Sequence, residues 1–466
     1  MRIPASKGLF YTLVSGIIII ALTYFAINYA KGSYRLTDNG LSPETGLLAA
    51  NSFPPGAEVY INDKLVTATD DTLYLDPGEY DVRISQDGYS TWQKRLTLEK
   101  ELVTQTNAKL FPSAPSITPL TFTGTENILP SPDGQKIVYY TASNSAQRKN
   151  GLYLLELADS PLSFQRGAKQ IAEDSSLIDL ATASFIWSPD STQLMIISPN
   201  RQVLIDTSKV NNLDALSDIS FSRKQILNDW EEEMYLREKQ FLSKFPEEII
   251  SLATQSAVNV YFSPNKKRLL YTATADLTLP DNLVPALPAA STQPQVRQLV
   301  KGGIYIYDQE EDRNFQVARA PEKSSFPLKH FLAISTSDKP NSVLESGSSV
   351  TPTGTNPAPL LYQSLQIDLD HPDQVLSPQE IAAKFNTYHS SLFADTLQWY
   401  PDSNHLFYAN DNQIKIMEYD STNIRTLYSG PFTNQFIYPW PDGSRLLITT
   451  NFTPQTPLNL YAVELK

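Results

Sequence analysis

The chain opens with one long apolar stretch and then changes to short runs in which apolar and polar residues alternate. Ala57, Val59 and Ile61, for example, are separated by Glu58 and Tyr60. A period of two is typical of half-buried strands, and Gly, Pro, Asp and Asn separate these runs as turn residues do. The pattern predicts an N-terminal helix followed by an all-β chain.

The apolar stretch at residues 9–27 carries no charge over 19 positions, about the length that a helix needs to cross a hydrocarbon core of about 30 Å. Tyr11, Tyr24 and Tyr29 stand where interfacial aromatic residues do. A cleaved secretory signal is the alternative, but the stretch is long for one, and the residues before Lys31 make a poor cleavage site. We therefore predict a cytoplasmic tail at 1–8, a transmembrane helix at 9–30 and a stalk at 31–46.

The N-terminal tail is too short to fold, so the folded and functional part of the chain is the part after the helix. We expect a single-pass cell membrane protein with its N-terminus in the cytoplasm and its bulk outside, and the lipid bilayer is then one partner of the chain.

Residues 47–111 predict a small β-sandwich. Asn62–Lys64, Asp76–Gly78 and Asp87–Gly88 provide turns between alternating runs. The segment resembles a PEGA domain in the order and spacing of four motifs: Pro55-Gly56-Ala57, Val59–Asn62, Leu75–Val82 and Gly88-Tyr89. The resemblance implies an extracytoplasmic module of bacterial and archaeal envelopes that has no catalytic residues.

Three aromatic residues of this segment, Tyr60, Tyr89 and Trp92, are candidates for stacking on a ligand such as a sugar ring. The alternative is packing within the sandwich, which is the commoner role of such residues.

Residues 116–466 contain a repeat in which a Pro-Asp or Pro-Asn turn precedes an apolar strand, usually after an aromatic residue. Its prolines are Pro132, Pro189, Pro264, Pro401 and Pro441. Repeats of this size indicate a propeller or a solenoid. The wide interval between the third and fourth copies has room for a degenerate blade at 330–335 and 365–369, which makes about six blades.

The ends of this repeat region also carry strand patterns. Residues 117–122, just before the first copy, and the C-terminal NLYAVEL are able to share one sheet and so close a ring. The repeat resembles TolB-like and WD40-like β-propellers, and this resemblance implies a fold that hosts many different partners.

A helical insertion is predicted at 226–253, where Asn228 or Asp229 can cap a helix and Pro246 can start a second one. Its apolar stripe either packs on the propeller or forms a docking helix for a partner, and the residues for that role are Trp230, Met234, Phe241 and Phe245. Two further insertions, 276–295 and 336–359, are small and polar, and we expect them to be disordered.

Composition restricts the chemistry. Lys and Arg total 37 against 50 Asp and Glu, a net charge of −13, which disfavours nucleic acid as a partner. The chain has no cysteine, and its four histidines form no metal-binding motif. No G-x-S-x-G motif is present, and the recurrent aspartates suit turns. We predict no catalytic, cofactor or metal site.

These patterns together predict a membrane-anchored binding or scaffold protein of the bacterial envelope, not an enzyme, that recognises a protein or glycan through its propeller. One alternative is a propeller-based extracellular hydrolase or lyase, which needs carboxylates or histidines converging at one channel mouth. The other is a structural component of a surface layer.

Overall fold

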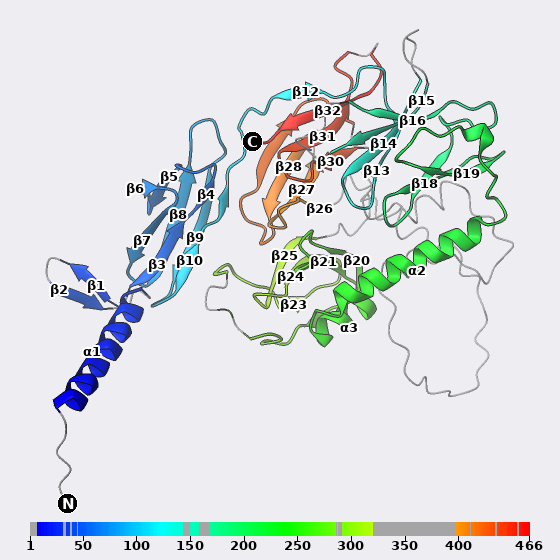
Figure 1. Cartoon of the computed structure of the whole chain (residues 1–466). Helices are drawn as coiled ribbons and strands as arrows, with labels where there is room; N and C mark the ends of the chain where they lie inside the picture. Colours follow the sequence, from blue (N-terminus) through cyan, green and yellow to red (C-terminus); the bar gives the residue numbers. More distant parts are fainter. Residues whose placement is uncertain are drawn as a thin grey trace, which may run out of the picture. The chain divides into compact units, whose positions relative to one another are not determined.

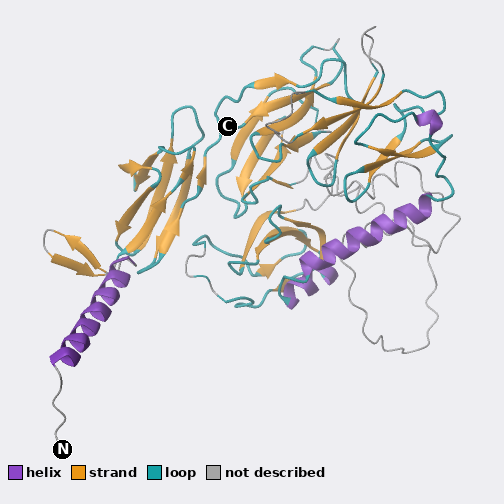
Figure 2. Cartoon of the chain, viewed as in Figure 1, coloured by secondary structure: helices purple, strands orange, loops and turns teal. Residues whose placement is uncertain are grey.

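The computed structural model of the chain describes residues 7–30, 34–37, 40–43, 45–142, 150–157, 167–285, 287, 291–319, 397–410, 412–433, 436–453 and 456–466. Contacts divide the chain into two compact units. Unit 1 contains Met1–Ser113 and Pro285–Pro294, and unit 2 contains Ala114–Val284 and Gln295–Lys466. The described part of the chain is mostly β with few helices, as the sequence predicts (Figures 1 and 2).

Unit 1 begins with helix α1, Lys7–Ala30. Its isoleucines at positions 17–20 are 52–70% exposed. Within the described residues, no helix has both the length and the apolar character that crossing a membrane requires. Part of the predicted stalk forms an antiparallel hairpin of β1, Tyr34–Thr37, and β2, Gly40–Pro43.

The rest of unit 1 is a β-sandwich. Its strands are β3 (Gly46–Ala50), β4 (Ser52–Phe53), β5 (Glu58–Ile61), β6 (Lys64–Ala68), β7 (Asp71–Leu75), β8 (Gly78–Ser85), β9 (Trp92–Leu98), β10 (Val103–Gln105) and β11 (Ala108–Lys109). The largest sheet has the order β6-β5-β8-β9, so β6 and β9 are its edges, and it packs against β10-β3-β7. Ala57, Val59 and Ile61 are buried while Glu58 is exposed, which confirms the alternation in the sequence.

The described residues of unit 2 form five antiparallel sheets of three or four strands, which we call blades 1 to 5. Blade 1 is β13 (Glu126–Pro130), β14 (Lys136–Thr141), β15 (Gly151–Glu156) and β16 (Lys169–Glu173); blade 2 is β17 (Ser184–Trp187), β18 (Gln193–Ile197) and β19 (Gln202–Asp206). Blade 3 is β20 (Ala257–Phe262), β21 (Arg268–Ala273), β24 (Gly303–Asp308) and β25 (Arg313–Arg319); blade 4 is β26 (Gln398–Trp399), β27 (His405–Asn410), β28 (Gln413–Glu418) and β29 (Arg425–Ser429).

Blade 5 joins the two ends of unit 2. Its strands are β30 (Ile437–Pro439), β31 (Arg445–Thr450), β32 (Asn459–Glu464) and, paired with β32, β12 (Ile117–Pro119). The predicted pairing of residues 117–122 with the C-terminal strand is thereby confirmed (Figure 1). The degenerate blade predicted at 330–335 and 365–369 lies outside the described residues.

The recurrent aspartates hold the turns between the first two strands of a blade. Asp133, Asp190, Asp402 and Asp442 each accept a backbone N–H two residues later through a side-chain oxygen, at 2.8–3.1 Å. Such a side-chain bond replaces the hydrogen bond that a tight turn leaves unmade. The predicted turn role of these residues is confirmed.

The same turns connect neighbouring blades. Between blades 1 and 2, the Asp133 N–H donates to Ser191 Oγ at 3.0 Å, and Lys136 Nζ donates to the Ser191 carbonyl at 2.9 Å. The indole Nε1 of Trp187 donates back to the Leu129 carbonyl at 3.4 Å. The aromatic residue of the repeat is therefore a donor to the preceding blade as well as a core residue.

Blades 3 and 4 repeat this set of bonds at the equivalent positions. The Asn265 N–H donates to Ser403 Oγ at 3.0 Å, Arg268 donates to the Ser403 carbonyl at 2.7 Å, and Trp399 Nε1 donates to Tyr261 at 3.4 Å. These two blades also share an apolar cluster, so their sheets pack directly on each other.

A helical insertion follows blade 2. It consists of a short 3-10 turn, Leu213–Ala215, then α2, Arg223–Leu242, and α3, Glu247–Gln255. Helix α2 begins after Ser222, so the caps expected at Asn228 or Asp229 are wrong, whereas Pro246 does precede α3. The sequence analysis placed the start of the helix at its acidic turn, but residues 223–227 before that turn are already helical.

Helix α2 packs on both blade 2 and blade 3. Its first half joins the face of blade 2 that turns away from blade 1, and its C-terminal end with α3 covers one face of blade 3. Arg237 donates to the Pro189 carbonyl in the turn of blade 2 at 3.1 Å. In blade 3, Lys266 stands where blades 2 and 4 have the accepting serine. At the junction of blades 2 and 3, α2 thus makes a bond to the turn in place of the serine bonds that connect blades 1 and 2 and blades 3 and 4.

The insertion at 276–295 has structure in its described part. Strands β22, Leu277–Thr278, and β23, Gln298–Leu299, pair at its base. Residues 285–294, which we call the arm, belong to unit 1. Gln293 in the arm is only 9% exposed, so this part differs from the disordered loop that was expected. Side-chain hydrogen bonds, which composition does not reveal, order it. The insertion at 336–359 lies outside the described residues.

Candidate functional site

The aromatic residues of the sandwich do not form an exposed platform. Trp92 is 2% exposed and lies in the core cluster, so it is not available to stack on a ligand. Tyr89 packs against the same core. Tyr60 is half-buried, with the Arg83 guanidinium 3.8 Å from its ring centroid and its hydroxyl donating to Glu58 at 2.7 Å. The stacking role is corrected for Trp92, because the strand period turns that residue inward.

The four candidates for a partner helix lie in apolar packing instead. Trp230 is 8% exposed and contacts blade 2, with Met234 beside it. Phe245 is buried on blade 3, with Phe241 packed against the same cluster. Their ring contacts with Phe262 have centroid distances of 5.9 and 6.1 Å. Burial of Trp230 and Phe245 agrees with the packing alternative, and Met234 and Phe241 are partly buried beside them.

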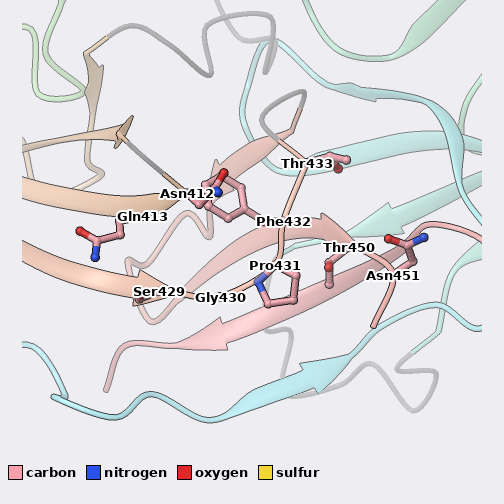
Figure 3. Close-up of a pocket in the computed structure, with 9 residues that line it drawn as sticks. All are labelled: Asn412, Gln413, Ser429, Gly430, Pro431, Phe432, Thr433, Thr450 and Asn451. Atoms are coloured by element: carbon pink, nitrogen blue, oxygen red, sulfur yellow. The ribbon is translucent and has the colours of Figure 1, made fainter. Parts of the chain in front are cut away.

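A pocket of about 470 Å³ lies between blades 4 and 5 (Figure 3). Three loops form it: the β27–β28 turn, the connection from β29 to β30 and the β31–β32 turn. These loops lie at the strand ends opposite the Pro-Asp turns, because each of β27 and β31 begins at such a turn and ends at the pocket. The lining residues are Asn412, Gln413, Ser429, Gly430, Pro431, Phe432, Thr433, Thr450 and Asn451.

Tyr428 fixes one wall of the pocket. Its hydroxyl donates to the Pro431 carbonyl at 3.1 Å, and its ring meets Phe432 edge to face at a centroid distance of 6.1 Å. A Cβ at Gly430 would lie 2.5 Å from the Tyr428 hydroxyl, so a larger residue cannot stand there without moving the ring. Burial raises the pKa of the Tyr428 phenol, which therefore stays neutral as a donor.

Thr433 is also fixed by hydrogen bonds within the described part of the β29–β30 connection. Its N–H and its hydroxyl both donate to the Thr449 carbonyl at 2.9 Å, next to the buried Thr450. On the opposite side, Asn412 adopts a positive φ of 59°, which suits the tight β27–β28 turn. Hydrogen bonds from the Tyr428 hydroxyl and from Thr433 to backbone carbonyls thus set the wall positions of the pocket.

The pocket offers neutral polar groups. The nine lining residues supply three side-chain amides, three hydroxyls, one phenyl ring, one proline and one glycine, and none of them is titratable. General acid or base catalysis needs a titratable group within hydrogen-bond reach of the reacting atoms, so these nine residues do not provide it. Among the described residues, no group of three His, Asp or Glu side chains is placed to hold a metal ion.

Sequence reasoning missed this pocket. No motif marks it, because its residues come from three separate loops of two repeats. The signal that was present is the pair Gly430-Pro431 followed by Phe432 in a connection between blades, where a rigid turn displays an aromatic side chain.

The structure therefore shows a mostly β chain with an N-terminal helix, a sandwich and a second unit of packed blades, and its pocket lies in the second unit. The family model of the PEGA domain matches residues 45–114, which cover the sandwich. This result supports the resemblance that the turn motifs of the sequence indicated. A comparison with curated protein sequences finds no match.

Several solved structures are similar to the chain. TolB from Acinetobacter baumannii is 11% identical, with 83% of this chain and 60% of that one covered and a TM-score of 0.19. A putative TolB from Agrobacterium tumefaciens is 10% identical, with 72% and 76% covered and a TM-score of 0.19. Oligogalacturonate lyase from Vibrio parahaemolyticus is 9% identical, with 83% and 86% covered and a TM-score of 0.25.

Proposed function

We propose that this chain is a membrane-tethered binding protein of the bacterial envelope and that the pocket between blades 4 and 5 recognises a neutral, hydroxyl-rich ligand such as a glycan. The composition of the pocket is the observation that carries the proposal. Amides and hydroxyls pair with sugar hydroxyls, and the Phe432 ring offers an apolar face to the C–H side of a sugar.

In this proposal unit 2 is a β-propeller of about six blades, and blades 1 to 5 are the ones that the structure describes. The repeated bonds through Ser191 and Ser403 support a ring built from one kind of junction. The pairing of β12 with β32 supports closure of that ring. A rigid ring with ligand-facing loops at one end suits recognition by a preformed site.

The tether in this proposal is α1. Residues 9–27 have no charge, and the isoleucines at 17–20 are exposed around the helix in the structure of the chain. Exposed apolar surface of this extent needs an apolar environment or a partner. Carbonate extraction of cell envelopes tests the tether: the full chain is expected to stay with the membrane pellet, and its release into the supernatant would contradict it.

The binding experiment uses the full chain in mild detergent on an array of neutral and charged glycans, followed by calorimetry with each sugar that binds. Phe432→Ala is expected to weaken binding at least tenfold, which corresponds to about 1.4 kcal/mol. Phe122→Ala is the control, because Phe122 is an exposed phenylalanine of unit 2 that does not line the pocket.

Two outcomes would overturn the glycan proposal: an array on which no neutral sugar binds, or equal affinity of Phe432→Ala and Phe122→Ala for the bound sugar. Turnover of the bound sugar by the wild-type chain would instead favour the hydrolase or lyase alternative. We propose binding without catalysis because the described lining of the pocket lacks an acid or a base.

A further inference from the structure

The arm, residues 285–294, makes two hydrogen bonds to the backbone of β9. The N–H of Thr97 donates to Thr292 Oγ1 at 3.3 Å, and Gln293 Nε2 donates to the Arg95 carbonyl at 2.8 Å. Arg95 and Thr97 are two residues apart, so their backbone groups point to the same side of the strand. That side is the edge of the sheet, because β9 pairs with β8 alone in the order β6-β5-β8-β9.

A local hydrogen bond orients the arm for this contact. The N–H of Gln293 donates to Ser291 Oγ at 3.3 Å, a local turn that orients the residue. The Gln293 side chain is largely buried, and burial of an amide costs free energy unless it is hydrogen-bonded, as it is here. A glutamine on a merely disordered loop would stay in water.

Arg297 anchors the residues at the base of the insertion. Arg297 donates to the Pro280 carbonyl at 2.7 Å and to Gln295 at 3.0 Å, and it pairs with Asp312 at 3.0 Å. One guanidinium thus bonds to the chain on both sides of the arm. Strands β22 and β23 pair beside it.

We infer that the described end of the arm, residues 291–294, is an intramolecular cover for the edge of β9 and that it prevents β9 from pairing with β9 of a second copy of this chain. An open edge strand presents unpaired N–H and C=O groups that recruit another strand. Thr292 and Gln293 satisfy one group of each kind with side chains and add no strand that would itself present a new edge. A second copy is the partner that fits, since two β9 strands can pair antiparallel about a twofold axis.

The first experiment measures amide hydrogen exchange in the full chain in mild detergent. Thr292→Val and Gln293→Ala together remove both side-chain partners. The Thr97 amide is expected to exchange about tenfold faster in this variant, as loss of one hydrogen bond worth about 1.4 kcal/mol implies. Leu287→Ala in the same arm is the control, because the Leu287 side chain is 48% exposed. Unchanged Thr97 exchange in the double variant would overturn the inference.

The second experiment measures self-association of the same proteins by analytical ultracentrifugation. The double variant is expected to dimerise at least tenfold more tightly than the wild type. Adding Thr97→Pro should abolish the gain, because proline removes the N–H that an added strand needs and is tolerated on an edge. Thermal unfolding of the triple variant checks that it is folded. A double variant with exposed Thr97 that dimerises no more than the wild type would also overturn the inference.

Discussion

Glu238 on α2 gives the sharpest test of the helical insertion. Burial raises the pKa of its carboxyl to about 8, although Lys266 and Arg237 oppose the shift. Burial likewise lowers the pKa of the Lys266 amine against the attraction of Glu238. The side chain thus lies where α2 meets the turns of blades 2 and 3. We predict that Glu238→Gln makes this junction more stable at alkaline pH.

The sign follows from the proton balance. In the unfolded chain the carboxyl loses its proton near pH 4.5, whereas in the folded protein it keeps the proton until about pH 8. The protonated form therefore stabilises the fold fully below pH 4.5, and this contribution is lost as the pH rises toward 8. A shift from 4.5 to about 8 corresponds to at most about 5 kcal/mol at 1.36 kcal/mol per unit. Because the side chain keeps some contact with water, we expect about 2 kcal/mol.

The assay is thermal unfolding of the full chain in mild detergent between pH 5 and pH 9. Glutamine has the shape of the protonated acid but does not titrate. Glu238→Gln should match the wild type near pH 5 and exceed its Tm by roughly 3 to 6 °C at pH 8 to 9. Glu232→Gln, on the exposed side of the same helix, is the control and should leave the pH dependence of the wild type unchanged.

The reasoning would be refuted by a constant difference in Tm between wild type and Glu238→Gln across this pH range. That result would mean that the carboxyl ionises as readily in the folded protein as in the unfolded chain. A lower Tm of the variant at pH 9 would show further that the ionised carboxylate stabilises the junction through Lys266.

Three further predictions concern packing and hydrogen bonds. Trp92→Ala should destabilise the sandwich by about 3 to 5 kcal/mol, because it empties a core position. In thermal unfolding, the Tm of the sandwich should fall while the Tm of unit 2 stays unchanged. Ser403→Ala should cost about 1 kcal/mol of unit 2 stability by removing the acceptor for the blade 3 turn, and a loss as large as a core cavity would contradict this. Burial alone would raise the pKa of the Asp442 carboxyl, but hydrogen bonds from Ser444 and Lys466 outweigh burial and hold this pKa below its usual value. The stability of Asp442→Asn, measured as Tm, should therefore fall less steeply than that of the wild type as the pH drops below 4, because the wild type loses this stabilising contribution there.

Most of the fold could be predicted from the sequence where one physical rule dominates. The period of two at Ala57, Val59 and Ile61 was enough to place a strand and its buried face. The recurrent Pro-Asp turns located the first two strands of each blade, because a turn that needs a side-chain acceptor selects the same residues each time. The pairing of residues 117–119 with the C-terminal strand followed from the extra strand pattern just before the first repeat.

The pocket and the arm could not be predicted, because both depend on contacts between segments distant in the sequence. Ser429 to Thr433 are ordinary loop residues until blade 5 brings Thr450 and Asn451 beside them. The arm is small and polar, which composition rules assign to disorder, and only the three-dimensional position of Arg95 and Thr97 gives its side chains partners. The start of α2 was misplaced because helix propensity varies little among the polar residues that precede its acidic turn.

The pairing of β12 with β32 also determines when this protein can finish folding. The Thr118 hydroxyl donates to the Ala462 carbonyl, 344 residues further along the chain. At a synthesis rate of roughly 5 to 20 residues per second, β12 waits about 20 to 70 s for its partner strand to be made. During that time its neighbours can assemble from local contacts, but blade 5 cannot. Premature termination anywhere in β32 would thus leave strands open at both ends of the repeat array, a nascent species at risk of aggregation that quality-control proteases can recognise.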